Sequence, residues 1–248
     1  MIGAVTDTPA APYFDSRPLP APKDCLYQHF LGHNITAETD IFDPTTAILM
    51  DFRCDQSQGL HFIYLLPTSP RTALVESTLF TATPLPDAYY EGAIAAYLAR
   101  HYPGAAYHST TTEKGIIPLA ECRDKQNPDT AIGARGGALR PSSGYAFALI
   151  QKQVRAIITH YKATKKWQAR PPISSGYIWM DKVFLHVLKA HPTIAISLFS
   201  KMAHALTGDE FARFMSGIPS WGCLMKIILA MPKRPFLQAA LMVMIGRG

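Results

Sequence analysis

Residues 60–80 read LHFIYLLPTSPRTALVESTLF, and this stretch decides the fold class of the chain. Two apolar runs rich in β-branched and aromatic side chains, residues 60–66 and 73–80, flank a short segment that contains two prolines. Such runs are typical of β-strands. Because parallel strands need a long crossover, so short a connection favours antiparallel strands. The stretch therefore predicts antiparallel pairing in the middle of the chain.

The same pattern extends outward in both directions. Residues 46–53 (TAILMDFR) form a further strand-like run before it, and residues 115–119 form another after a segment with helical spacing at 89–100. The short connections between the runs at 46–53, 60–66 and 73–80 predict an antiparallel meander. The apolar side of the intervening helix is expected to hold Tyr90, Ile94, Tyr97 and Leu98.

Beyond the strands the chemistry of the sequence changes. Residues 133–145, GARGGALRPSSGY, run into a helix expected from about Tyr145 to Trp167. Its predicted apolar stripe consists of Phe147, Ile150, Val154, Ile157, Ile158 and Tyr161. Helical patterns broken by Pro and Gly occupy the rest. The expected class is α+β, with an irregular segment at 1–24, an antiparallel sheet domain at 25–132, a glycine-rich loop and helix at 133–168, and a basic helical region at 169–248.

Composition narrows the function classes. With 248 residues, 48% of them hydrophobic, the chain is a folded protein rather than a disordered tail. Residues 1–150 carry 10 basic and 15 acidic side chains, whereas residues 151–248 carry 14 basic and 3 acidic, so the second part is expected to lie against something anionic. No nucleic-acid-binding motif accompanies that charge, so nucleic acid is not expected as a partner.

The cysteines and histidines point to no metal centre. The four cysteines lie far apart without a CxxC pair, and we expect reduced thiols in a cytoplasm. Neither they nor the nine histidines have metal-ligand spacing, so no metal site is predicted. No run of 18 apolar residues occurs, so a spanning helix is not expected.

Three carboxylates are candidates for acid–base chemistry. Strand alternation places Glu76 on one face with Leu74, Thr78 and Phe80, where desolvation would raise its pKa into the range of a general acid. A solvated sheet face is the alternative. Asp51 has a similar environment, with an ion pair to a nearby Arg as its alternative. For Glu113 the alternative is a carboxylate in a turn.

The glycine-rich loop is a candidate anion site. Free backbone N–H groups at the start of the following helix could face a phosphate, a ribose oxygen or a flavin carbonyl. The spacing matches neither a Walker A motif nor GxGxxG, so a tight turn before a helix stays open as the alternative.

Several motifs occur in a fixed order along the chain. They are YQHFLG at 27–32, MDFR at 50–53, FIYLLP at 62–67, ALVESTLF at 73–80, EKGIIP at 113–118 and RPSSGY at 140–145, with KVFL at 182–185 and MPKRPFL at 231–237. From about residue 13 to the end, this series resembles the flavin-dependent lycopene cyclases of bacterial carotenoid synthesis.

The resemblance implies a lycopene β-cyclase, which closes the acyclic ends of lycopene into β-ionone rings without net redox change, giving γ-carotene and β-carotene. It implies reduced FAD as cofactor, with NAD(P)H as reductant. Glu76 would be the acid, with Asp51 and Glu113 as further catalytic candidates. Some relatives carry a second acid where this chain has Ser77. The implied cofactor-binding residues are Gly136, Gly137, Pro141, Ser142, Ser143, Gly144 and Tyr145, and the implied substrate-binding residues are Phe62, Tyr64 and Phe80.

The family begins with a dinucleotide-binding βαβ unit, and this chain shows no glycine fingerprint for one. We therefore expect the C-terminal part of a two-domain flavoprotein, which binds flavin weakly alone and has a separate N-terminal dinucleotide-binding segment as a partner. Lycopene or a related acyclic carotenoid and an anionic membrane surface are the other expected partners, with peripheral attachment at the cytoplasmic face.

Two alternatives stay open. One is another flavoprotein of similar build, such as a prenyl reductase or a monooxygenase. The other is a non-catalytic, membrane-associated remnant that binds carotenoid without turning it over.

Overall fold

A single antiparallel sheet of five strands forms the centre of the protein, whose computed structural model describes residues 13–246. The spatial order is β2-β3-β4-β1-β5. The strands are β1 (Leu26–Ala37), β2 (Ile48–Asp51), β3 (Leu60–Pro67), β4 (Thr72–Thr81) and β5 (Tyr107–Leu119). Every neighbouring pair is antiparallel, which confirms the predicted sheet and the α+β class.

The meander predicted for the runs at 46–53, 60–66 and 73–80 is confirmed as β2-β3-β4, whereas β1 lies between β4 and β5, an order that the sequence pattern did not predict. The connection from β4 to β5 carries the helix α1 (Asp87–His101), which is long enough to pass over β1. The strand expected at 46–53 is also shorter than predicted. Only Ile48 and Asp51 pair with β3, and the register shifts between them.

One face of the sheet is covered by α1. The side chains predicted for its apolar face, Tyr90, Ile94, Tyr97 and Leu98, are all buried. They pack on strand residues that alternate toward this side, namely Leu31, Ile35, Ile63, Leu65, Val75 and Leu79. The period-2 pattern of the strands and the helical pattern of α1 therefore meet in one core.

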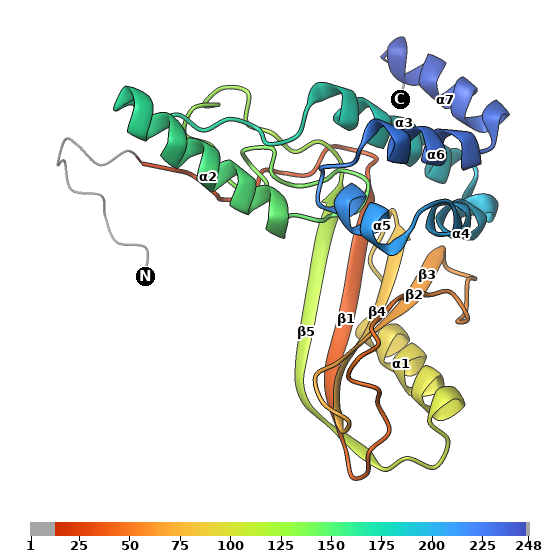
Figure 1. The fold of residues 1–248 in the computed structure, drawn as a ribbon. Coiled ribbons are helices and arrows are strands. Elements are labelled where there is room, and N and C mark those ends of the chain that lie inside the picture. Colours follow the sequence, from red (N-terminus) through yellow and green to blue (C-terminus); the bar gives the residue numbers. More distant parts are fainter. Residues whose placement is uncertain (1–12, 247–248) are drawn as a thin grey trace.

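The opposite face is covered only at one end, by helices that follow the glycine-rich loop. Figure 1 shows these helices across the upper end of the strands, with α2 projecting to one side and α3 to α7 to the other. They are α2 (Phe147–Thr164), α3 (Ser175–Ala190), α4 (Ala195–Ala205), α5 (Gly208–Met215), α6 (Trp221–Ala230) and α7 (Lys233–Met244), with a short 3-10 turn at Pro192–Ile194. Phe62, Phe80 and Leu119 of the sheet share a second core with Val187 and Leu198 of this helical layer.

The stripe predicted for α2 is confirmed fully only at Ile157, although Ile150 and Tyr161 are partly buried. Phe147 is 70% exposed, and Val154 and Ile158 also face solvent, whereas Leu149, Gln153 and Ile157 are buried. The buried side is centred on a polar residue, because the Gln153 amide binds the backbone of the preceding loop at Gly133 N (2.9 Å) and Gly136 O (3.0 Å). A pattern based on hydrophobicity cannot recognise such a face.

Within residues 13–246 no single helix is long and apolar enough to cross a membrane. Two bent pairs reach that length and composition only when joined: α3 with residues 192–205, bent by 107°, and α6 with α7, bent by 112°.

Candidate active site

Glu76 lies on the sheet face that α1 does not cover. In the strand register it stands between Tyr64 of β3 and Gly32 of β1, and Gly32 pairs in turn with Glu113 of β5. These four residues form one row across four strands. The row brings two carboxyl groups to the two sides of a residue that has no side chain.

Gly32 permits the two acids to approach each other. A Cβ atom at Gly32 would lie 3.2 Å from Cγ and 3.4 Å from Oε1 of Glu113, so the Glu113 side chain extends over this backbone toward Glu76. Glu113 lies within β5, so the alternative of a turn carboxylate is wrong. The sequence predicts both acids but not their pairing, because the register of two strands 81 residues apart, at Gly32 and Glu113, is not a local property.

The surroundings of Glu76 favour its protonated form. Burial raises its pKa to about 7, and the negative charge and hydrogen bonding of Glu113 act in the same direction. The Thr78 hydroxyl opposes this by donating a hydrogen bond to Oε1 of Glu76 at 2.5 Å. Burial, with the Glu76 charge adding to it, raises the pKa of Tyr64 to about 12, so this neighbour stays a neutral phenol. Glu76 is thus a carboxyl group that can hold a proton near neutral pH.

Asp51 is not part of this arrangement. It pairs with Ile63, which faces α1, and its carboxylate accepts hydrogen bonds from Arg53 (2.6 Å) and from the Tyr97 hydroxyl (3.2 Å). The hydrogen bond from Arg53 is the largest influence on Asp51 and holds its pKa at about 2. The structure therefore gives Asp51 the ion-pair role that the sequence offered as an alternative, on the far side of the sheet from Glu76.

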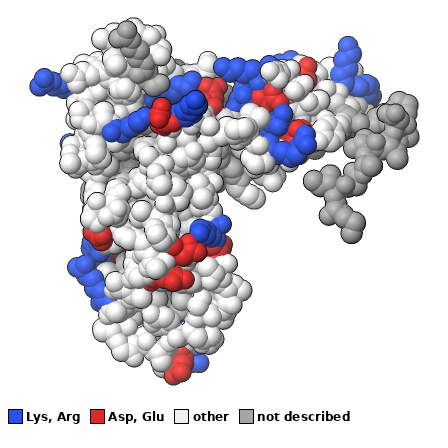
Figure 2. All heavy atoms as spheres, turned by 180° about the vertical axis from the view of Figure 1, so that it is seen from behind, with Lys and Arg blue, Asp and Glu red and all other residues white. Residues whose placement is uncertain are grey.

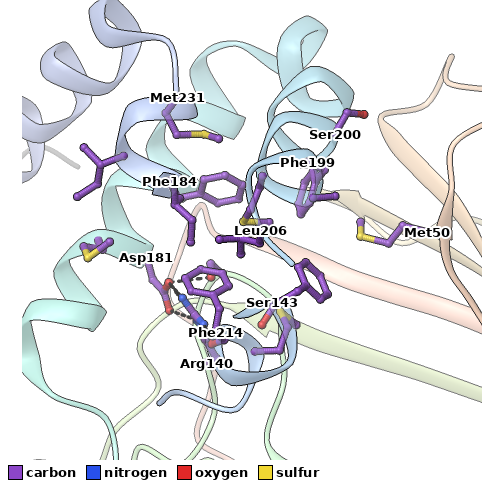
Figure 3. Close-up of a pocket in the computed structure, with 18 of the residues that line it drawn as sticks. Met50, Arg140, Ser143, Asp181, Phe184, Phe199, Ser200, Leu206, Phe214 and Met231 are labelled. Carbon is purple, nitrogen blue, oxygen red and sulfur yellow. Dashed lines mark hydrogen bonds and ion pairs between the residues drawn. The ribbon is translucent and has the colours of Figure 1, made fainter. Parts of the chain in front are cut away.

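An apolar cavity of about 740 Å³ lies between the upper end of this face and the helical layer. Its floor includes Gln28, Tyr64 and Phe80 of the sheet, and Figure 3 shows Phe184 and Phe199 along its wall. Phe62 does not line it but supports the floor, with ring centroids 5.2 Å from Tyr64 and 5.6 Å from Phe80. The three predicted substrate residues therefore form one aromatic cluster, and Tyr64 connects the cavity to the row that holds Glu76.

A buried ion pair closes the other side of the cavity. Arg140 donates to both carboxylate oxygens of Asp181 at 3.2–3.3 Å, and the Ser142 hydroxyl donates to Asp181 at 2.8 Å. Arg140 also donates to Phe214 O at 2.6 Å, with its guanidinium 4.2 Å from the centre of the Phe214 ring (Figure 3). This network ties the glycine-rich loop to α3 and α5.

Sequence reasoning missed both Arg140 and Asp181 as site residues. The available signal was Asp181 itself, one of only three acidic residues after position 150, in a helix that is otherwise apolar or basic. A lone acid in such a helix predicts a buried partner.

The predicted cofactor loop divides into two groups. Gly136 and Gly137 serve the packing and turning of the chain: a Cβ at Gly136 would lie 2.3 Å from Ala131 O, and Gly137 has φ +76°. Pro141 lines a second, smaller cavity, and Ser142 belongs to the Asp181 network.

Ser143, Gly144 and Tyr145 lie next to the start of α2. Ser143 lines the apolar cavity, and its buried hydroxyl oxygen has no hydrogen-bond partner among the described residues. Gly144 has φ +65°, which turns the chain, and the Tyr145 carbonyl accepts a hydrogen bond from Arg140 N. The first N–H groups of α2 that follow have no acceptor within the helix.

A partly buried acid, Glu76, with the exposed Glu113 beside it and an aromatic-lined cavity on the same face of the sheet is suited to acid–base chemistry on a large apolar molecule. Comparison with known proteins shows which family this chain belongs to. The chain belongs to the lycopene cyclase family, since the family model described as lycopene cyclase protein matches residues 4–241. This confirms the resemblance inferred from the motifs.

Two curated relatives agree with the family. The lycopene β-cyclase of Pantoea ananas is 26% identical over 222 residues, which cover 81% of this chain and 55% of the relative. The lycopene β-cyclase of Paracoccus sp. (strain N81106 / MBIC 01143) is 32% identical over 129 residues, 48% of this chain and 32% of the relative. The chain thus spans about half the length of the Pantoea protein.

Solved structures with some likeness include a geranylgeranyl bacteriochlorophyll reductase-like protein from Thermoplasma acidophilum (TM-score 0.47, 9% identity, 88% of this chain and 56% of that one). Another is a triple mutant of the flavin-dependent brominase Bmp2 (TM-score 0.48, 17% identity, covering 92% of this chain and 57% of that one).

Proposed function

We propose that this chain performs the cyclisation chemistry of a lycopene β-cyclase, converting the acyclic ends of lycopene or a related carotenoid into β-ionone rings. The observation that carries the proposal is Glu76, a carboxyl group with a pKa of about 7 in a row that continues through Tyr64 into an apolar cavity. An apolar polyene needs such a cavity, and protonation of an alkene needs a shielded acid.

The proposed reaction is an isomerisation that balances without an external reagent. Glu76 donates its proton to the terminal double bond, which leaves a carbocation. The neighbouring double bond attacks that cation, so a carbon–carbon bond closes the six-membered ring. The ring then loses one proton to the carboxylate pair, which restores the double bond and the acid. Glu113, whose side chain extends toward Glu76 over Gly32, is the second member of that pair.

The aromatic cluster supports the charged intermediate. The ring faces of Tyr64 and Phe80, which line the cavity, carry negative charge density, and each is worth about 1–2 kcal/mol to a desolvated cation, while Phe62 supports both rings from below. Because Tyr64 stays protonated, it adds no full negative charge that would trap the cation covalently.

We also propose that the loop at 141–145 faces reduced FAD, with NAD(P)H as its reductant. The residues fit such a group, because the buried Ser143 hydroxyl has no partner among the described residues and lies beside the N–H groups at the start of α2. Bound reduced flavin would supply negative charge near the cation. A separate dinucleotide-binding segment is the proposed partner for the remainder of the cofactor.

Attachment to the cytoplasmic face of an anionic membrane completes the proposal. It is supported by the net +11 charge of residues 151–248 and by the solubility of a carotenoid in lipid. Figure 2 shows many Lys and Arg side chains over the upper, helical part of the molecule.

Replacing the proposed acid tests the function. Wild type and Glu76→Gln would be expressed in cells that accumulate lycopene, each with a dinucleotide-binding segment supplied as a second chain. We expect β-carotene formation to fall at least about 100-fold in the variant, because glutamine keeps the size but has no transferable proton. Glu121→Gln, which removes a surface partner of Lys182, is the matched control and should retain activity. Near wild-type cyclisation by Glu76→Gln would refute the assignment.

A further inference from the structure

The outer side of α6 and α7 is unusually apolar for an exposed surface. Trp221 is 83% exposed and Leu237 is 70% exposed. Six further large apolar side chains are also exposed, namely Met225, Ile228, Leu229, Leu241 and Met244 on these helices and Ile245 just after α7. We call these eight residues the elbow surface, since the two helices meet at a bend of 112°.

The elbow surface is patterned rather than scattered. On α6 its members recur at positions 221, 225, 228 and 229, and on α7 at 237, 241 and 244, which is the spacing of one helical face. The inner faces of the same helices are buried through Cys223, Leu224, Ile227 and Ala239. Each helix is therefore apolar on two sides, although the core needs only one.

The charged side chains on α6 and α7 themselves are all basic. No Asp or Glu occurs after Glu210, whereas Lys226, Lys233 and Arg234 lie within α6 and α7. Lys226 is paired with Glu210 (2.6 Å), and Lys233 Nζ binds the carbonyl oxygens of Ile228 and Leu229 at the end of α6. Arg234 is exposed next to them. Cations beside exposed Leu, Ile, Met and Trp side chains match the boundary between anionic headgroups and acyl chains.

The elbow surface also borders the apolar cavity. Ile228, Lys233 and Leu237 line that cavity while remaining partly or largely exposed. A molecule dissolved in the acyl chains would thus meet the cavity without crossing water, provided that this surface rests in the bilayer.

We propose that the elbow surface docks into one leaflet of an anionic bilayer and that the cavity opens to the acyl chains beside it. Docking is independent of the reaction, whereas the identity of the apolar ligand rests on the proposed function. The charge of residues 151–248 alone did not say which part of the protein contacts the membrane. In this proposal α6 and α7 insert their apolar side chains, and the basic residues strengthen the binding.

Vesicle binding by the intact chain tests this proposal. Sedimentation with phosphatidylcholine vesicles, with and without phosphatidylglycerol, would compare wild type with Leu229→Ser/Leu237→Ser and with Phe147→Ser. Phe147 is the matched control, since it is 70% exposed, as Leu237 is, but lies on α2. We expect at least a tenfold lower partition coefficient for the double variant and no change for Phe147→Ser. Arg234→Gln should bind neutral vesicles normally and lose part of the preference for phosphatidylglycerol.

Trp221 provides a direct probe of depth. In a Trp167→Phe/Trp179→Phe background its fluorescence should shift to shorter wavelength on vesicle binding and be quenched by lipids brominated along the acyl chain. No binding, equal loss in Phe147→Ser, or unquenched Trp221 would overturn the proposal. A dimer in sedimentation velocity that Leu229→Ser/Leu237→Ser dissociates would also overturn it, by assigning the surface to a second copy. Glu76→Gln should bind vesicles normally, so failure of the cyclisation chemistry and failure of docking can be told apart.

Discussion

Glu76 shows how a single residue depends on neighbours that are distant in sequence. Alternation within residues 73–80 predicts its face and its apolar surroundings, and the structure agrees. The sequence could not predict that Glu113 lies beside Glu76. The two side chains approach each other only because β1 lies between β4 and β5 and contributes Gly32 at that point. The local pattern thus predicts the face on which Glu76 lies, whereas long-range pairing brings the second carboxyl group to it.

Glu113→Gln tests that partnership. Removing the negative charge should lower the pKa of Glu76 below its value of about 7, but not to 4.5, because burial is the largest cause of the shift. Titration of the Glu76 side-chain carboxyl carbon by NMR in selectively ¹³C-labelled protein would measure this. Glu121→Gln is the control at a distant ion pair. An unchanged Glu76 titration in Glu113→Gln would mean that the two carboxyl groups do not interact.

At the scale of elements, the glycine-rich loop is held by its contacts with helices that follow it. The sequence predicts its position and the helix after it, with an anion site or a tight turn as its role, but not the side chains that hold it in place. In the structure the Arg140 guanidinium donates hydrogen bonds to Asp181 of α3 and to a backbone carbonyl in the last turn of α5. The buried stripe of α2 likewise depends on Gln153 binding the loop backbone. Polar contacts between elements leave no hydrophobic period in the sequence, and this is why both were missed.

Asp181→Asn should destabilise the whole helical layer. The Asp181 and Arg140 side chains are only 4% and 8% exposed, so the substitution leaves a buried guanidinium without its counter-charge. We expect a loss of about 3–5 kcal/mol in the free energy of unfolding measured with urea. The double variant Arg140→Met/Asp181→Leu should recover much of that loss, because it removes both charges together. A loss below about 1 kcal/mol in Asp181→Asn would show that the pair is solvated in solution.

At the scale of the whole molecule, the two faces of the sheet carry titrating groups that change the stability of the protein with pH in opposite directions. On the α1 side His29 is buried, with hydrogen bonds to Tyr90 (2.7 Å) and Thr81 (2.7 Å). Burial, with the charge of His61 adding to it, lowers the pKa of His29 from 6.5 to about 4. Burial also lowers the pKa of His61. On the open side the pKa of Glu76 is raised from 4.5 to about 7.

The shifts of His29 and Glu76 have opposite effects on stability between about pH 4.5 and 7 and should largely cancel there, while the lowered pKa of His61 adds to the effect of His29. As the pH falls from 6.5 towards 4, the unfolded chain binds a proton at His29 that the folded protein does not, so the free energy of unfolding decreases. As the pH falls from 7 to 4.5, the folded protein binds a proton at Glu76 that the unfolded chain does not, so the free energy of unfolding increases. Each effect is worth about 3 kcal/mol at most, at about 1.4 kcal/mol per pKa unit. Lowered carboxyl pKa values such as that of Asp51 act only below about pH 4.

Replacing either Glu76 or His29 should therefore reveal the contribution of the other to the pH dependence of stability. Urea unfolding from pH 4.5 to 7.5 should show Glu76→Gln losing stability on acidification, through His29 and His61, because the opposing contribution is gone. His29→Asn should show a weaker loss from the α1 side and hence a net gain on acidification through Glu76. Glu121→Gln should keep the wild-type profile, since its carboxylate pairs with Lys182 and with none of these titrating groups. Identical profiles for wild type and Glu76→Gln would mean that Glu76 is solvated in the folded protein, and the shielded acid would then have to be sought elsewhere on the sheet.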